Sequence, residues 1–213
     1  MSAGAGAKGL LLAMMEPPAN IEEEFQDWYD SEHFPERQNC EGFETANRFV
    51  CIDGFPRYLA VYDLTDVDVL RGPGYAAIAL GRYSRWTHRI MAKVWGQFRA
   101  EGVQIHPGTA LLGDNGPSSR FVVWRIRQLP AALQPALIEG LRAIYDERSA
   151  CAQVRVFRVP GPDPADHLAL VELRGTAPAP DVAKLGAAAA HVDLVNTYVR
   201  YARQAPGAFP KTT

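Results

Sequence analysis

The chain has few of the residues that build metal centres or disulfide frameworks. Its 213 residues include 3 cysteines, and Cys40, Cys51 and Cys151 are scattered without a CxxC spacing. An odd number of isolated thiols argues against a disulfide framework and against a zinc site, and it fits a reducing compartment. We therefore expect a cytoplasmic protein without a metal.

The sequence also lacks an excess of charge of either sign. Its formal net charge is −2, and the nearest approach to a basic cluster is a single helix face carrying Arg82, Arg85, His88 and Arg89. Binding to nucleic acid independently of its sequence needs several clustered Lys and Arg contacts to phosphates. We expect no nucleic-acid partner.

Long hydrophobic runs are missing as well. The first apolar stretch, residues 9–15, stops at Glu16-Pro17-Pro18, well short of the ~20 residues that cross a bilayer. Only one Lys precedes it, so it does not resemble a signal peptide. We expect no membrane partner, a first strand at residues 9–15, and a flexible Ala/Gly tail at residues 1–8.

What the sequence does contain is enough apolar material for a hydrophobic core: 47% of its residues are hydrophobic and 22% charged. After the first strand, Asn20 begins a helix that Pro35 ends or sharply bends just beyond His33. The rest of this half, residues 9–110, is predicted as a hairpin of strands 43–52 and 57–64, an interrupted helical stretch 66–90, and a strand within 93–106.

The same order of elements then begins again. Residues 111–119, rich in Gly, Pro, Asn and Ser, are the predicted linker to a second half, residues 120–213. We expect its elements to be a strand at 120–127, a helix at 131–148, strands at 154–159 and 167–173, and a final helix from Asp181 to about Tyr201. No eighth strand is evident.

The two halves share a sequence pattern as well as the order of their elements. YLAVYDL at residues 58–64 matches HLALVEL at 167–173 position by position, about 110 residues later, which indicates a tandem duplication of a whole domain. The fold class is therefore α+β: two ferredoxin-like β-α-β-β-α-β repeats. The strands are apolar on both faces and helices cover only one, so we expect two antiparallel sheets packed face to face as a barrel. The alternative is two separate half-domains that each dimerise elsewhere.

A resemblance narrows this class. The segment DWYDSEHFPER at residues 27–37, followed by Gly42-Phe43 and by PRYLAVY at 56–62, is similar to the EthD-like members of the dimeric α+β-barrel superfamily. The resemblance implies a homodimer. It covers the first half well, whereas IYDER at residues 144–148 echoes the motif without its His and Pro. The second half is thus expected to be degenerate.

His33 is the first candidate catalytic residue, because imidazole exchanges protons near neutral pH. Glu32 beside it would fix its tautomer and raise its pKa. The remaining candidates are four aromatic wall residues and two arginines that bind a substrate oxygen: Trp28, Tyr29, Tyr58, Tyr62, Arg37 and Arg48.

Each candidate also has a structural interpretation. His33 before Pro35 is equally typical of a residue that caps a helix. Trp28 is typical of a core residue, and Arg37 and Arg48 of surface ion pairs. These alternatives stay open at the level of sequence.

Members of the superfamily include cofactor-free isomerases, lyases, decarboxylases and monooxygenases. The leading hypothesis is a cofactor-independent enzyme that acts on a small aromatic or polyketide-like acid, ketone or lactone by proton transfer, as a lyase, isomerase, dehydratase or decarboxylase. One alternative is a non-catalytic protein that binds such a molecule in the same cavity. Another is a haem enzyme resembling chlorite dismutase, with His191 as the iron ligand.

Overall fold

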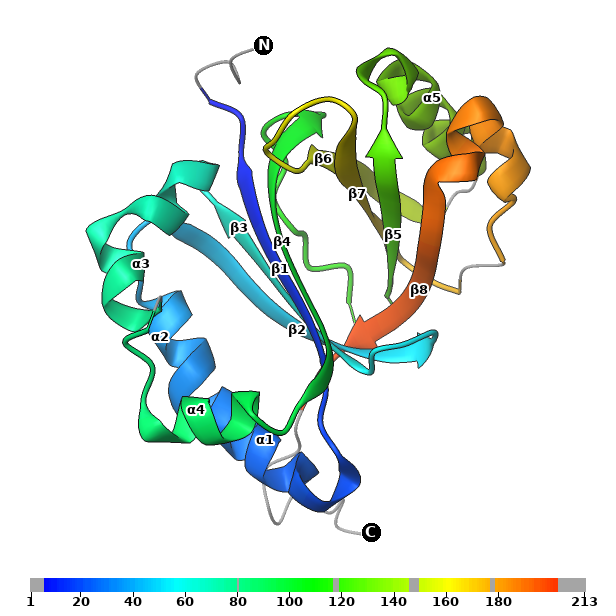
Figure 1. The fold of residues 1–213 in the computed structure, drawn as a ribbon. Helices are drawn as coiled ribbons and strands as arrows, with labels where there is room; N and C mark the ends of the chain where they lie inside the picture. Colours follow the sequence, from blue (N-terminus) through cyan, green and yellow to red (C-terminus); the bar gives the residue numbers. More distant parts are fainter. Residues whose placement is uncertain (1–5, 80, 117–118, 146–149, 177–178, 203–213) are drawn as a thin grey trace, which may run out of the picture.

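Eight antiparallel strands form a ring that closes on itself within one chain (Figure 1). The computed structural model describes residues 6–79, 81–116, 119–145, 150–176 and 179–202. Around the ring the strands follow the order β1-β3-β2-β8-β5-β7-β6-β4, and β4 pairs with β1. The predicted α+β barrel of facing antiparallel sheets is confirmed.

The first four strands form one side of the ring with the ferredoxin-like order β4-β1-β3-β2. In chain order the elements are β1 (Gly9–Glu16), a 3-10 turn (Ala19–Ile21), α1 (Glu22–Trp28), a π-helical turn (Tyr29–His33), α2 (Phe34–Gln38), β2 (Phe43–Asp53), β3 (Tyr58–Leu64), a 3-10 turn (Val67–Arg71), α3 (Pro73–Ile78), α4 (Arg85–Met91) and β4 (Trp95–His106).

The other four strands form the second side with the equivalent order β8-β5-β7-β6. Its elements are β5 (Arg120–Leu129), a 3-10 turn (Ala131–Leu133), α5 (Gln134–Tyr145), β6 (Cys151–Arg158), β7 (Ala165–Leu173), a 3-10 segment (Val182–His191) and β8 (Val192–Arg200). Of the helix predicted at 131–148, residues 146–148 lie outside the described residues, as do residues 1–5 of the predicted tail.

Two seams join the sides. β2 pairs with β8, where Val50 faces Val199, and β4 pairs with β6, where Val103 faces Arg158. The two sheets therefore share hydrogen bonds, and the alternative of two half-domains that each dimerise elsewhere is wrong. Closing the barrel needs no second copy of the chain, and the homodimer stays a prediction.

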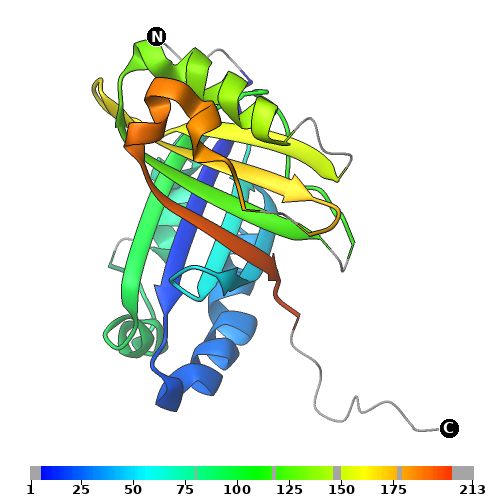
Figure 2. The ribbon, with the colours of Figure 1, turned by 90° about the vertical axis from the view of Figure 1, so that its right-hand side faces the viewer.

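The strands bury both faces, as their continuous apolar runs predict. In β3 all seven residues are buried. Alternate residues such as Leu59 and Val61 point into the barrel, where they pack with Phe121 and Leu170 of the second side. The intervening residues point outward against helices: α1 to α4 cover one sheet and α5 covers the other (Figures 1 and 2).

One charged cluster lies inside the barrel. The guanidinium of Arg155 on β6, fully buried, lies 2.6 Å from the Asp63 carboxylate on β3 and 3.4 Å from Glu172 on β7. Both carboxylates also hold the segment between the halves, since Asp63 accepts a hydrogen bond from the amide of Leu112 and Glu172 accepts one from the amide of Gly113. Arg155 thus joins both sheets and their connection.

Two predicted elements differ from the structure. Of the two outcomes predicted at Pro35, an end of the first helix is wrong and a sharp bend stays a prediction, because the π-helical turn lets the Phe34 amide bond to the Tyr29 carbonyl and the proline enters the first turn of α2. The helix predicted from Asp181 to Tyr201 is wrong: Gly186 has a φ of 57°, and the chain then forms the missing eighth strand. Its β-branched and aromatic residues pair with β5 and β2.

In the described ranges, no helix has both the length and the apolar character needed to cross a membrane.

Replacing Arg155 with Met leaves Asp63 and Glu172 buried without their cation. We expect the free energy of unfolding near neutral pH to fall by about 3–5 kcal/mol, because breaking a buried ion pair leaves a charge in the interior. The stranded carboxyl groups will bind protons more tightly in the folded than in the unfolded protein, so the loss should shrink as the pH is lowered. Urea unfolding at several pH values measures both effects.

The control is Arg127→Met, which removes a surface ion pair of 2.7 Å to Asp166. Exposed pairs contribute less than about 1 kcal/mol, so this variant should unfold nearly like the parent protein. A loss in Arg155→Met that does not change with pH would contradict the assignment.

Candidate functional site

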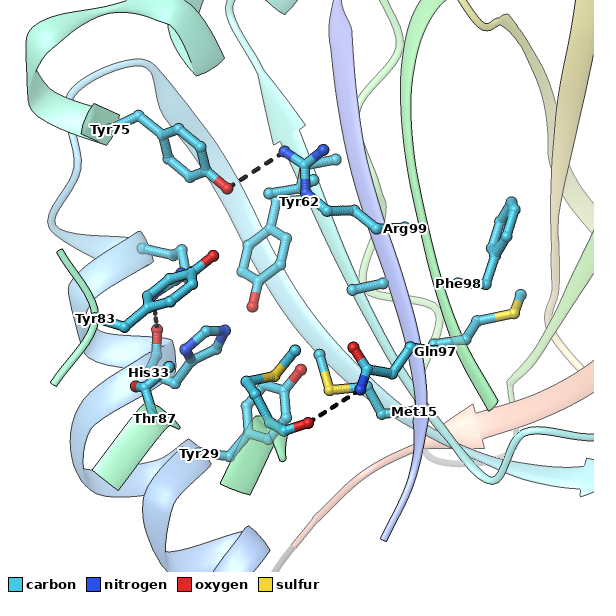
Figure 3. Close-up of a pocket in the computed structure, with 15 residues that line it drawn as sticks. Met15, Tyr29, His33, Tyr62, Tyr75, Tyr83, Thr87, Gln97, Phe98 and Arg99 are labelled. Atoms are coloured by element: carbon cyan, nitrogen blue, oxygen red, sulfur yellow. Dashed lines mark hydrogen bonds between the residues drawn. The ribbon is translucent and has the colours of Figure 1, made fainter. Parts of the chain in front are cut away.

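A small cavity lies between the helices of the first half and the outer face of its sheet. Its volume is about 110 Å³. The walls come from the π-helical turn, α2, α3, α4 and the connection before α4, and the floor comes from β1, β3 and β4. The described residues that line it are Leu11, Ala13, Met14, Met15, Tyr29, His33, Arg37, Tyr62, Tyr75, Tyr83, Thr87, Met91, Gln97, Phe98 and Arg99 (Figure 3).

The π-helical turn places two of the predicted site residues on this wall. Tyr29 and His33 are the first and last residues of the turn, so their side chains share a face, and both are buried. Their rings contact edge to face, with centroids 5.2 Å apart. π-helical turns are rare in proteins, and those that do form are frequently found at functional sites.

The His33 ring is held by stacking and not by hydrogen bonds. It stacks on Trp28 with centroids 4.1 Å apart. Its Nδ1 is buried and has no partner among the described residues, and no bond from Nε2 to any of them is formed either. The interpretation of His33 as a helix cap bonded to carbonyls therefore finds no support.

Burial lowers the pKa of His33 well below its ordinary value of 6.5, and the positive charges of Arg37 and Arg48 lower it further. The imidazole is therefore neutral at neutral pH. This is opposite in direction to the raised pKa expected from a carboxylate neighbour, because the Glu32 carboxylate bonds elsewhere.

Glu32 positions the histidine indirectly. Its carboxylate accepts hydrogen bonds from Ser84 (2.5 Å) and Thr87 (2.9 Å) of the α4 region. Thr87 in turn accepts a bond of 2.9 Å from the indole of Trp28, against which His33 stacks. The network fixes α4 against α1 and holds the Trp28 ring under the imidazole.

Two other predicted residues reach the cavity. The hydroxyl of Tyr62 is buried with no hydrogen-bond partner among the described residues, and Figure 3 shows it pointing across the cavity toward His33. Burial raises its pKa well above 10, so it remains a proton donor. Arg37 is buried and lines the wall, although its Nη1 donates to Glu36 (2.9 Å) and to the His33 carbonyl (3.2 Å).

Trp28, Arg48 and Tyr58 do not line the cavity. Trp28 is a fully buried core residue behind His33. Arg48 donates to Asp30 and Gln26, and its guanidinium lies between the rings of Tyr29 and Tyr201, 4.1 and 4.2 Å from their centroids.

Tyr58 hydrogen-bonds to Glu22 at the start of α1. Like Arg48, it ties the first helix to the sheet at a distance from the space beside His33, so the substrate-binding roles predicted for the two residues stay predictions.

Several lining residues were missed at the level of sequence. Tyr75 and Tyr83 come from the α3–α4 region, and Gln97 and Arg99 from β4. On β4, Gln97 and Arg99 alternate with Phe98 and Ala100, which belong to the barrel core. This alternation is the signal that would have placed both polar residues on the helix-covered face.

The corresponding space in the second half is filled. Trp124, Leu141, Ile144 and Tyr145 pack between α5 and the sheet, each at most 1% exposed. His191 ends a 3-10 segment instead of lying on an α-helix, and its Nδ1 lies 3.0 Å from the carbonyl oxygen of Arg127. Because Trp124, Leu141 and Tyr145 fill the space between α5 and the sheet, that space does not fit a haem group, and His191 as an iron ligand stays a prediction.

Among the described residues, no cluster of three or more His, Cys, Asp or Glu side chains has a metal-binding arrangement.

The first-half cavity combines a neutral base, a neutral phenol donor and an arginine within apolar walls. A side chain with a free ring nitrogen removes a proton, and buried donors opposite it stabilise negative charge that forms on the ligand. The arrangement is therefore suited to proton transfer on a small molecule.

Comparison with solved structures shows that this fold is shared along the whole chain. An anthrone oxidase-like protein superposes with a TM-score of 0.67 and 13% identity, covering 100% of this chain and 99% of the other. Chlorite dismutase from Candidatus Nitrospira defluvii, in complex with imidazole, superposes with a TM-score of 0.55 and 12% identity, covering 91% of each chain. At these identities the comparison shows a shared fold. No protein-family model matches the chain, and no curated protein is similar to it in sequence.

The low pKa of His33 makes stability depend on pH. The unfolded chain takes up a proton near pH 6.5 and the folded protein does not, so stability should decrease as the pH falls from about 6.5 to the folded-state pKa. Denaturant unfolding between about pH 7 and pH 5 measures this slope. We expect His33→Asn to reduce the slope, with a remainder from His167, whose pKa burial also lowers, whereas His88→Asn, which removes an exposed imidazole, keeps it. An NMR titration that finds His33 protonated at pH 6.5 in the folded protein would contradict the expectation.

Proposed function

We propose that the protein is a cofactor-independent enzyme that transfers a proton on a small aromatic or polyketide-like acid, ketone or lactone. The observation that carries the proposal is the imidazole of His33: it is neutral, unbonded within the described chain, and placed on the wall of an apolar cavity. A buried histidine without a structural hydrogen bond is costly to keep unless a ligand supplies the partner.

In the proposed step, His33 takes a proton from a carbon next to a carbonyl group or from a phenol of the ligand. The electron pair of the broken bond moves onto the ligand oxygen, which becomes an enolate or phenolate. Arg37 and Arg48 disfavour the imidazolium that forms, so the proton returns readily, either to another carbon in an isomerisation or to a leaving oxygen in a dehydration.

Tyr62 and Arg37 support this step by binding the oxygen on which charge develops. The Tyr62 hydroxyl has no protein acceptor among the described residues and faces His33 across the cavity (Figure 3). Donors that are already in place contribute about 2.7–4 kcal/mol each to such a transition state in other enzymes. Glu32 acts as a positioning residue through Thr87 and Trp28.

The size of the cavity limits the ligand. A dry cavity of roughly 150 Å³ holds a benzene molecule in a protein interior, and the cavity here measures about 110 Å³. Any aromatic ligand must therefore displace part of the wall when it enters. Among the lining residues, Gln97 and Arg99 on β4 are exposed.

We assign the site to the first half of the chain. We infer that the chain is a tandem duplication whose first copy, EthD-like in its motif at residues 27–37, keeps the cavity. The second copy has replaced it with a packed core around Trp124 and Tyr145. The equal strand orders of the two sides support this inference.

Exchange of ligand protons with solvent tests the proposal without knowledge of the product. The probes are 2-tetralone, 4-hydroxyacetophenone and dihydrocoumarin in D₂O, followed by NMR, with and without dioxygen because one structural neighbour is named as anthrone oxidase-like. We expect faster exchange next to at least one carbonyl group, and a drop of about 10²–10⁴ in His33→Gln. Tyr62→Phe should lose about 10²–10³.

The matched control is His88→Gln, which replaces an exposed histidine outside the cavity and should exchange like the parent protein. If a probe binds in the cavity and its protons do not exchange with solvent, the proposed enzymatic function is contradicted. The alternative of a non-catalytic binding protein is then favoured. Exchange that His33→Gln leaves intact would remove His33 from the mechanism.

A further inference from the structure

The charge that lines the cavity is of one sign. Two arginines, Arg37 and Arg99, are among the described residues of its wall, and none of the others is a carboxylate. Arg37 lies on α2 and is buried. Arg99 lies on β4, and its side chain is 46% exposed, so it stands where the cavity meets solvent. A cavity with this lining favours an anionic ligand.

The charge of Arg99 is only partly neutralised by its neighbours. Its Nη1 lies 2.8 Å from the carboxylate of Glu101, which is shared with Arg71 at 3.1 Å. Two guanidinium groups thus compete for one carboxylate. The only other acid paired with them in the described chain is Asp68, 4.0 Å from Arg71 and highly exposed. Arg99 therefore has one carboxylate partner among the described residues, and it shares that partner with Arg71.

The second hydrogen bond of Arg99 goes to Tyr75 on α3, a buried residue whose ring stacks on Phe43. Its Nη2 donates to the hydroxyl of Tyr75 over 3.3 Å, a long and weak bond (Figure 3). Tyr75 lines both this cavity and an open cleft of about 330 Å³ beside α3. Since α3 has only six residues, few backbone hydrogen bonds oppose its movement.

We propose that Arg99 is a specificity-determining anion site, which selects ligands that carry a carboxylate. The carboxylate replaces the Tyr75 hydroxyl on the guanidinium, and the released tyrosine ring moves toward the cleft. The inference rests on the proposed function in that it concerns the same cavity, and it narrows the ligand from acids, ketones and lactones to acids.

Geometry favours a carboxylate over a neutral oxygen at this position. A planar guanidinium can form two parallel hydrogen bonds to a carboxylate, and both partners are then ionised, whereas the Tyr75 phenol is neutral and accepts one bond. Exchange of Tyr75 for a carboxylate is therefore favourable. Movement of the Tyr75 ring also enlarges the cavity, whose present volume is about 110 Å³.

The test compares acids with their uncharged amides. Benzoate, salicylate and 1-naphthoate are titrated calorimetrically into the full chain, each beside its primary amide. We expect at least one acid to bind about tenfold or more tightly than its amide. In Arg99→Gln this preference should disappear. In Arg71→Gln, which removes an equal charge that shares Glu101 but does not line the cavity, it should persist.

A second variant tests the exchange of partners. Tyr75→Phe removes the hydroxyl that competes for Arg99, so the acids should bind a few times more tightly than to the parent protein, whereas a purely structural Tyr75 would give equal or weaker binding.

The inference is overturned if none of the acids binds, if the amides bind equally well, or if Arg99→Gln keeps the preference. His33→Gln should retain the acid preference while losing proton exchange, which separates a failure of this site from a failure of the proposed chemistry.

Discussion

The guanidinium of Arg155 is the point on which both halves of the molecule converge. It bonds to a carboxylate on each sheet, and these carboxylates bond to the chain that links the sheets. The ion pair between Arg155 and Asp63 crosses the interior of the barrel, so it helps to fix how one sheet faces the other. The outer face of β1, β3 and β4 is the floor of the cavity. The shape of the cavity floor therefore depends in part on the contact of Asp63 with Arg155, which lies on the inner face of β3.

The strands and their facing arrangement could be predicted because continuous apolar runs need cover on two sides. β8 could not. Residues 188–195 are compatible with a helix by local propensity, and only the free edges of β5 and β2 decide for a strand. The end of the first helix was mispredicted for a related reason: a π-helical turn has no sequence signature that distinguishes it from a helix that stops at proline.

Of the site, the part near His33 in sequence could be predicted, and the part that folds over it could not. Tyr29, His33, Arg37 and Tyr62 do line one cavity. A contact between Glu32 and His33 was expected because the two residues are adjacent in sequence. Consecutive helical residues point in different directions, however, and the Glu32 carboxylate bonds to Ser84 and Thr87 of the α4 region instead. Arg48 was expected to bind a substrate oxygen, but its guanidinium already contacts Asp30, Gln26 and two aromatic rings.

Closure of the ring by a single chain has a consequence for ligand saturation. A barrel assembled from two identical subunits presents every cavity twice, and its two copies can influence each other through the shared strands. Here the two sides differ, one hollow near His33 and the other filled by Trp124 and its neighbours. One barrel then offers this cavity once, so occupancy within a barrel follows a simple hyperbola with one ligand per chain and no cooperativity.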